Sequence, residues 1–79
     1  MEKYKNLSGL SNVAEYEIKD DRIVVKFKGK NRDGCDTYEY TYAKTGQTNV
    51  DHMKHLAIKG IGLNSFIMNT VRKLYERKY

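Results

Sequence analysis

The side chains most often used in catalysis or metal binding are few in this chain. His52 and His55 stand three residues apart, a spacing that puts both imidazoles on one side of a helix, where they could share a metal ion. A metal site needs more than two ligands, and neither Cys35 nor a cluster of carboxylates supplies the others. We therefore interpret these histidines as part of a solvent-facing helix surface, with Asp51 and His55 as an i, i+4 pair.

Cys35 is the only cysteine. A catalytic thiolate usually needs a positive charge or a helix N-terminus beside it, and the spacing assigns none, so we interpret Cys35 as a plain thiol. A single cysteine cannot form an internal disulfide, and residues 1–6 are charged and polar with no apolar run behind them. We expect a cytoplasmic protein with no membrane span, no catalytic residues, no metal and no cofactor.

Three tyrosines alternate with polar residues in Tyr38-Glu39-Tyr40-Thr41-Tyr42. A period of two is typical of a strand whose successive side chains point to opposite faces of a sheet. Rings on one face can stack on the bases of a single-stranded nucleic acid, or they can form the domain core. We favour the core, because the apolar stripes of the helices must be buried against this face of the sheet. We expect Tyr38 and Tyr42 to be the more exposed rings.

The chain has a formal net charge of +5, all of it in the second half. Residues 1–43 contain eight basic and eight acidic residues, whereas residues 44–79 contain seven basic residues and two acidic ones. Such a bias suggests an anionic partner such as nucleic acid, although small domains also use net charge for solubility. The basic residues expected to contact phosphates from the outer helix faces are Lys54, Lys59, Arg72, Lys73 and Arg77.

Three segments have the alternating apolar pattern of strands, at about residues 12–18, 22–28 and 36–42. Residues 1–10 are expected to be irregular. The face expected to be buried carries Ala14, Tyr16, Ile18, Ile23, Val25, Phe27, Tyr38, Tyr40 and Tyr42. The opposite face should be exposed, with cross-strand charge pairs among Glu15, Glu17, Glu39, Arg22, Lys26 and Lys28.

After Ala43 the apolar period changes to that of helices. A first helix is expected to start with Thr48 or Asn49 as its cap and to end at Gly60, and a second should run from about Asn64. The stripe of the second helix contains Phe66, Ile67, Val71, Leu74 and Tyr75. The sequence therefore predicts a single α+β domain, in which a three-stranded antiparallel meander is packed on one face by two C-terminal helices.

Several short motifs occur in a fixed order between residues 11 and 67. They are Ser11-Asn12-Val13 followed by Tyr16, then Tyr-x-Tyr at either Tyr38/Tyr40 or Tyr40/Tyr42, then Val50 and Ala57, then Gly62-x-Asn64-x-x-Ile67. This pattern resembles the KTSC domain, a small module named from the C-terminus of some lysyl-tRNA synthetases. The loop at residues 29–34 is longer than in that family, and the basic residues after Ile67 lie outside the pattern. The resemblance implies a compact, often stand-alone bacterial domain for which RNA binding has been suggested, and no catalytic residues.

These observations favour a non-enzymatic nucleic-acid-binding module, with RNA as the preferred ligand. Its basic helix residues would contact phosphates, and Tyr38 or Tyr42 would stack on bases. The alternative is a protein-interaction or self-associating domain, such as one carried by a mobile element. That domain would associate through an exposed sheet edge or around Ile58, an apolar residue on the polar side of its helix. An enzyme is the third hypothesis.

Overall fold

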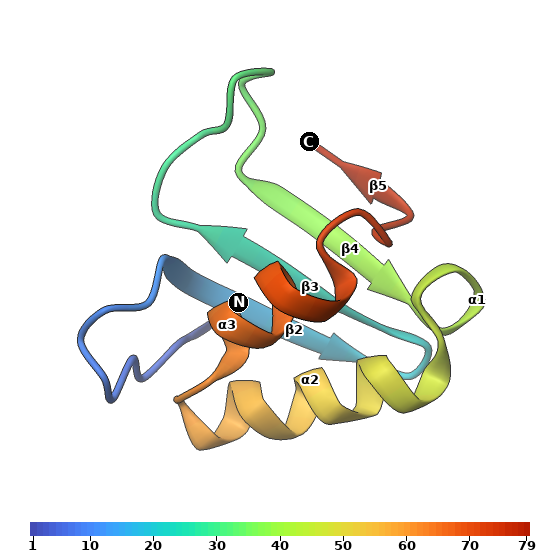
Figure 1. The fold of residues 1–79 in the computed structure, drawn as a ribbon, viewed down its shortest axis with the longest axis horizontal. Helices are drawn as coiled ribbons and strands as arrows, with labels where there is room; N and C mark the ends of the chain where they lie inside the picture. The colour runs from blue at the N-terminus through green and yellow to red at the C-terminus, as the bar shows by residue number, and fades with distance from the viewer.

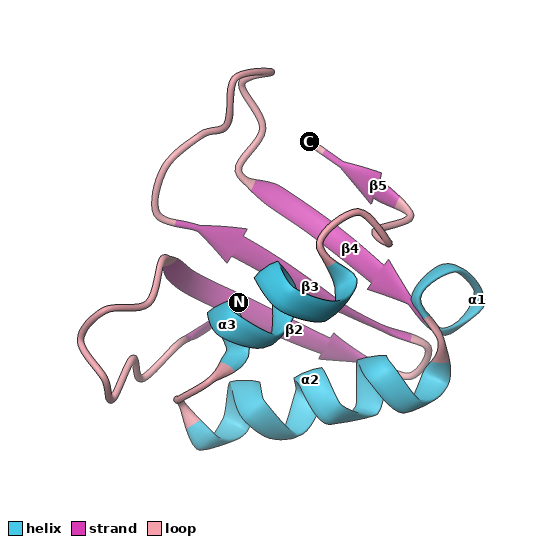
Figure 2. Cartoon of the chain, viewed as in Figure 1, coloured by secondary structure: helices cyan, strands magenta, loops and turns pink.

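The computed structural model describes residues 1–79 and places an antiparallel five-stranded sheet behind a layer of helices (Figure 1). The strands are β1 (Glu2–Lys3), β2 (Val13–Lys19), β3 (Arg22–Phe27), β4 (Thr37–Thr41) and β5 (Arg77–Lys78), adjacent in that order. The helices are α1 (Tyr42–Thr45), α2 (Gln47–Lys59) and α3 (Leu63–Phe66), and α3 continues into one π-helical turn, η1 (Ile67–Val71) (Figure 2). The α+β class and the antiparallel sheet are confirmed, but the sheet has five strands instead of three.

The two additional strands lie at the edges of the sheet. In β1, Glu2 pairs with Tyr16 of β2, within a segment that we expected to be irregular. In β5, Lys78 pairs with Tyr38 of β4. An unpaired edge strand exposes a row of amide and carbonyl groups. A short added strand forms hydrogen bonds with some of these groups. A strand of two residues is too short to show alternation, so periodicity could not reveal either one.

A bulge in β2 changes which of its side chains enter the core. Val13 pairs with Phe27 and Glu15 pairs with Lys26, which leaves Ala14 as the extra residue between them. A shift of one residue moves every side chain beyond it to the other face of the strand. Val13 is therefore buried beside Phe27, and the prediction that Ala14 is the core residue at this end of the strand was wrong.

The core fills the space between one face of the sheet and the helices. Its buried residues are Tyr4, Val13, Ile23, Val25, Phe27, Tyr40, Val50, Met53, Ala57, Leu63, Ile67 and Val71. Tyr40 is 1% exposed, whereas Tyr38 and Tyr42 are only partly buried, as expected for the end positions of the tyrosine segment. Tyr42 lies beyond the strand, because β4 ends at Thr41, whose hydroxyl oxygen caps α1 by accepting from the amide of Lys44.

The second predicted helix is shorter than its apolar stripe suggested. The helical segment ends at Val71, and the chain turns, with the amide of Leu74 donating to the carbonyl of Val71 at 2.9 Å. The amide of Glu76 then donates to the carbonyl of Glu39 at 2.8 Å, where β5 joins β4. Residues 72–77 have good helix formers, so pairing with the edge of β4 overrides their local preference.

The N-terminal segment is fastened to the end of α2 at Gly60. This residue ends α2 in the left-handed conformation (φ 84°), as the sequence predicted, while Gly46 takes the place of Thr48 or Asn49 at the start of the helix. The carbonyl of Gly60 accepts from the amide of Leu7 at 2.8 Å. A Cβ atom at Gly60 would lie 2.6 Å from the Cβ atom of Lys5, so the two segments can approach this closely only with glycine here.

We expect Gly60→Ala to destabilise the protein more than Gly34→Ala. Gly34 has a similar φ of 81° but has nothing within 4 Å of an added Cβ, so this variant loses only the conformational advantage of glycine, about 1 kcal/mol. Gly60→Ala adds the collision with Lys5, about 1–3 kcal/mol more. Urea unfolding of both variants measures the difference. Equal losses of unfolding free energy in the two variants would show that the N-terminal segment can move away from the added Cβ atom without loss of stability.

Candidate functional site

An open pocket of about 390 Å³ lies between the loop before β4, the face of the sheet and the turn after η1. Its apolar and aromatic lining consists of Phe27, Tyr38, Tyr40, Met68 and Tyr75. Its other lining residues are Asn12, Gly29, Lys30, Asn31, Cys35, Arg72 and Lys73. Sites for small ligands usually measure about 300–1,000 Å³, so this pocket has room for one compact ligand.

Tyr38 is at the centre of the aromatic cluster that forms the pocket. Its ring meets the ring of Phe27 edge to face at 5.5 Å between centroids, and the ring of Tyr75 in the same manner at 5.0 Å. Tyr40, two residues along β4, lies nearly parallel to Tyr38 at 6.4 Å. Edge-to-face packing is favourable for aromatic pairs and fixes the rings relative to one another. The pocket is therefore built on strand residues and one ring from the turn after η1.

The loop before β4 is held in place by the side chain of Asn31. Its Oδ1 atom accepts from the amides of Asp33 and Cys35, both at 2.9 Å, and its Nδ2 atom donates to the hydroxyl of Tyr38. Lys78 fixes the same loop to β5, with its Nζ atom 2.6 Å from Oδ2 of Asp33. One side of the pocket is thus a loop that is tied to the sheet at two points.

The hydroxyl of Tyr40 has no hydrogen-bond partner within the protein, although the residue is 1% exposed. Tyr40 lines the pocket, so its hydroxyl has access to whatever occupies that space. Burial raises the pKa of Tyr40, and the neighbouring hydroxyls of Tyr38 and Tyr75 raise it further. The hydroxyl of Tyr38 already accepts from Asn31, so its own proton is also left for another acceptor.

Three cationic side chains, Lys30, Arg72 and Lys73, surround the pocket. They are exposed, none of them forms an ion pair, and the lining contains no carboxylate. Arg72 and Lys73 follow directly after η1, and π-helical turns often occur at functional sites. The pocket therefore combines an aromatic interior with an unpaired positive rim.

Two of the predicted binding residues, Lys54 and Tyr42, are occupied by contacts within the protein. The ammonium group of Lys54 donates to the carbonyl of Lys19 at 2.7 Å and to the hydroxyl of Tyr42 at 3.0 Å, and it lies 4.8 Å from the centre of the Tyr42 ring. The hydroxyl of Tyr42 donates to Asp51. These contacts connect α2 to the turn between β2 and β3, away from the pocket.

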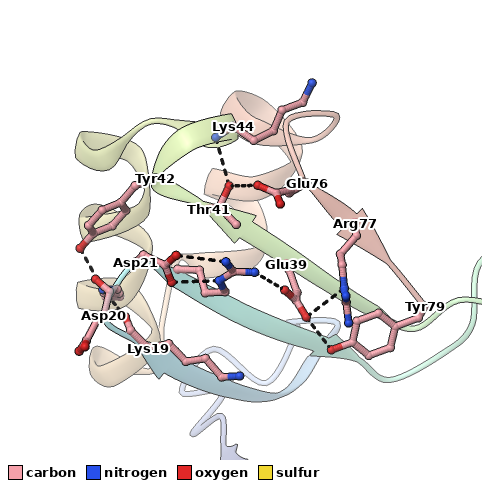
Figure 3. Close-up of polar contacts among 12 residues, drawn as sticks. Lys19, Asp20, Asp21, Glu39, Thr41, Tyr42, Lys44, Glu76, Arg77 and Tyr79 are labelled. Carbon is pink, nitrogen blue, oxygen red and sulfur yellow. Dashed lines mark hydrogen bonds and ion pairs between the residues drawn. The ribbon is translucent and has the colours of Figure 1, made fainter.

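Arg77 also lies apart from the pocket, because β5 replaces the end of the predicted helix. It faces the side of the sheet opposite the helices, with its Nε atom 3.3 Å from Oε2 of Glu39. Glu39 also accepts from Nη1 of Arg22 at 2.7 Å and from the hydroxyl of Tyr79 at 2.9 Å (Figure 3). Glu39 is 6% exposed and its neighbour Val24 is 2% exposed, so the prediction that this face is exposed was wrong for its centre.

The structure thus brings together Tyr38, Arg72 and Lys73 from the predicted site and leaves Lys54, Lys59, Arg77 and Tyr42 outside it. Sequence reasoning missed Lys30 and Asn31 in the loop, Tyr75 in the turn, and the hydroxyl of Tyr40. A loop asparagine between two glycines is a known turn signal, but nothing in the sequence indicated its bond to Tyr38. Tyr75 was expected on the apolar stripe of a helix, so the sequence did not indicate that its ring packs against Tyr38 of β4.

His52 and His55 do not combine with other potential ligands. The ring of His52 packs edge to face against Phe66 at 4.7 Å between centroids. No three side chains of histidine, cysteine, aspartate or glutamate are grouped as a metal site would require. Cys35 lines the pocket as a half-buried thiol.

Comparison of the chain with protein-family models, with curated proteins and with solved structures finds no match. The resemblance to the KTSC domain stays a prediction. None of the helices has both the length and the apolar composition needed to span a bilayer.

We expect Glu39→Gln to lower the free energy of unfolding by about 1–3 kcal/mol at neutral pH, because glutamine keeps the shape and loses the charge-assisted hydrogen bonds. Burial alone would raise the pKa of Glu39, but the hydrogen bonds from Arg22 and Tyr79 and the charge of Arg77 outweigh burial and lower it. A pKa that is lower in the folded state stabilises the fold above the unfolded pKa of about 4.3, and this stabilisation is lost as the pH falls through the folded value.

Urea unfolding of the wild type and of Glu39→Gln between about pH 7 and about pH 3 measures this effect, and the two stabilities should converge in acid. Glu17→Gln is the matched control, since Glu17 lies on the same face, is exposed and has no ion pair. A gap between wild type and Glu39→Gln that stays constant with pH would contradict the role of the charge.

Proposed function

We propose that this protein is a non-enzymatic module that binds nucleic acid, preferably single-stranded RNA, through the pocket. The single observation that carries the proposal is the combination of four aromatic rings with three unpaired cations in one pocket that has no carboxylate. Such a site selects a ligand that has both a negative charge and a planar apolar part. A nucleotide unit of a single strand has both.

The distribution of charge favours an extended anion over an isolated small one. Arg72 and Lys73 are adjacent in the turn after η1, while Lys30 comes from the loop on another side of the pocket. Cations on separate segments can contact successive phosphates of a strand, and each contact adds salt-dependent affinity. Single strands are favoured over duplexes because the aromatic rings are accessible only to an unstacked base. The KTSC resemblance supports RNA over DNA.

The test is a fluorescence titration with a labelled single-stranded RNA of about ten nucleotides, and with DNA of the same sequence, at two salt concentrations. If three phosphates are neutralised, affinity should fall roughly twentyfold between about 50 and 200 mM salt. Arg72→Glu with Lys73→Glu should weaken binding strongly and should lower the salt slope by at least about 1.4, because two phosphate contacts are lost.

The matched control is Lys44→Glu with Lys59→Glu, which changes the net charge by the same amount at two exposed residues outside the pocket. It should weaken binding only through long-range electrostatics. An absence of binding at low salt would refute the proposal, as would equal losses in the two double variants.

A second candidate function is self-association, and one observation favours it. Ile58, 59% exposed on α2, lines a shallow depression with Ile18 of β2, Met1 and Tyr16, and the other lining residues are Glu2 and Glu17. The N-terminal segment pairs with the edge of β2 at Ala14, Glu15 and Tyr16, and none of these pairings reaches Ile18. Exposed apolar groups beside an open strand edge are typical of contacts between protein chains.

Sedimentation velocity over a range of protein concentrations tests this candidate. If the patch is an interface between copies, Ile58→Lys should shift the protein toward monomer, because a charged group would be buried at the contact. Leu10→Lys is the control, since Leu10 is 89% exposed and does not line the depression. A wild type that remains monomeric at millimolar concentration would exclude self-association at this surface.

A further inference from the structure

The interior of the pocket has a feature that phosphate binding does not use. Tyr40 is almost wholly buried, yet its hydroxyl has no partner in the protein, and the free proton of the Tyr38 hydroxyl is close by in the same pocket. That hydroxyl is open to the pocket, because no fully buried polar side-chain atom of the protein lacks a hydrogen-bond partner. Two hydroxyls with free protons that line an aromatic pocket are therefore available to a polar ligand group that reaches the interior.

We propose that the pocket binds one unpaired nucleotide, with its base inside against the hydroxyls of Tyr38 and Tyr40 and its phosphate outside at Lys30, Arg72 and Lys73. A free nucleoside monophosphate is then a ligand of the same site. This inference rests on the proposed function and specifies the chemical unit that the site recognises.

The orientation follows from the different chemistry of the interior and the rim. A phosphate in the interior would lose much of its hydration beside the buried ring of Phe27, which offers no hydrogen bond in return. A base in the interior replaces water with aromatic contacts, and its ring nitrogens and carbonyl oxygens accept hydrogen bonds from tyrosine hydroxyls. The phosphate remains at the rim, in contact with both solvent and the unpaired cations.

The size of the pocket limits the ligand to one nucleotide. A volume of about 390 Å³ is near the lower end of the range for small-molecule sites, so a second stacked base does not fit. The walls also restrict the approach of a duplex, because the loop held by Asn31 and the turn at Arg72 stand on different sides of the opening. A base-paired nucleotide would have to leave its helix before it could enter.

The first experiment measures whether free nucleotides compete with labelled single-stranded RNA for the pocket. Each of the four common nucleoside 5′-monophosphates should displace labelled single-stranded RNA, with an affinity no tighter than about 10 µM for a ligand of this size. The matching nucleosides and inorganic phosphate should each compete much more weakly. A blunt RNA duplex of the same length should bind less tightly than the single strand.

Tyr40→Phe removes the unpaired hydroxyl and little else. It should weaken binding of the monophosphate about three- to tenfold, which corresponds to one neutral hydrogen bond, while the stability of the protein stays the same or rises. Tyr42→Phe is the matched control with the opposite pattern. It removes a hydroxyl that donates to Asp51 outside the pocket, so stability should fall while affinity is unchanged.

The outcomes separate the two proposals. If single-stranded RNA binds but monophosphates at about 10 mM do not displace it, or if Tyr40→Phe binds as well as the wild type, the single-nucleotide site is wrong and the nucleic-acid-binding function stands. A duplex that binds as tightly as the single strand also overturns it. If neither RNA nor monophosphate binds, both proposals fail.

Discussion

The pairing of β5 with β4 is the constraint on which the rest of this structure depends. Without it the outer edge of β4 would expose its amide groups, and the helical segment after Gly62 would be free to continue. Because Glu76 and the residues after it join the sheet, the chain must turn between Val71 and Arg77. That turn places Tyr75 against Tyr38 and sets Arg72 and Lys73 at the opening of the pocket.

The same pairing divides the positive charges into two groups with different roles. Arg77 goes to the far face of the sheet, where it and Arg22 neutralise the buried carboxylate of Glu39. Lys78 holds the loop through Asp33, and Lys54 holds a turn through backbone carbonyls. The cations that remain unpaired at the pocket are those on the loop and the turn. The net charge of the chain therefore says less about binding than the position of each cation does.

The sequence predicted those parts of the fold in which a pattern of apolar side chains repeats over several residues. The central strands, α2 with its buried Val50, Met53 and Ala57, and the glycine that ends it all follow from periodicity and capping. The two-residue strands and the bulge at Ala14 each depend on pairing between distant segments, for which a single chain shows no local sign. Part of the site could not be predicted for the same reason. Tyr75 lines the pocket together with Lys30 only because β5 pairs with β4.

The hydroxyls of Tyr38 and Tyr40 have different roles in the pocket. A phenylalanine at position 40 would pack the same core without an unpaired hydroxyl, and the aromatic contacts of Tyr38 need no oxygen either. Tyr38 uses its hydroxyl to hold Asn31, which gives that oxygen a structural role. The Tyr40 hydroxyl has no partner within the protein, so it is left for whatever enters the pocket. A hydroxyl that the fold itself does not use, on the wall of a pocket, is the group that a ligand can bind without breaking a contact within the protein.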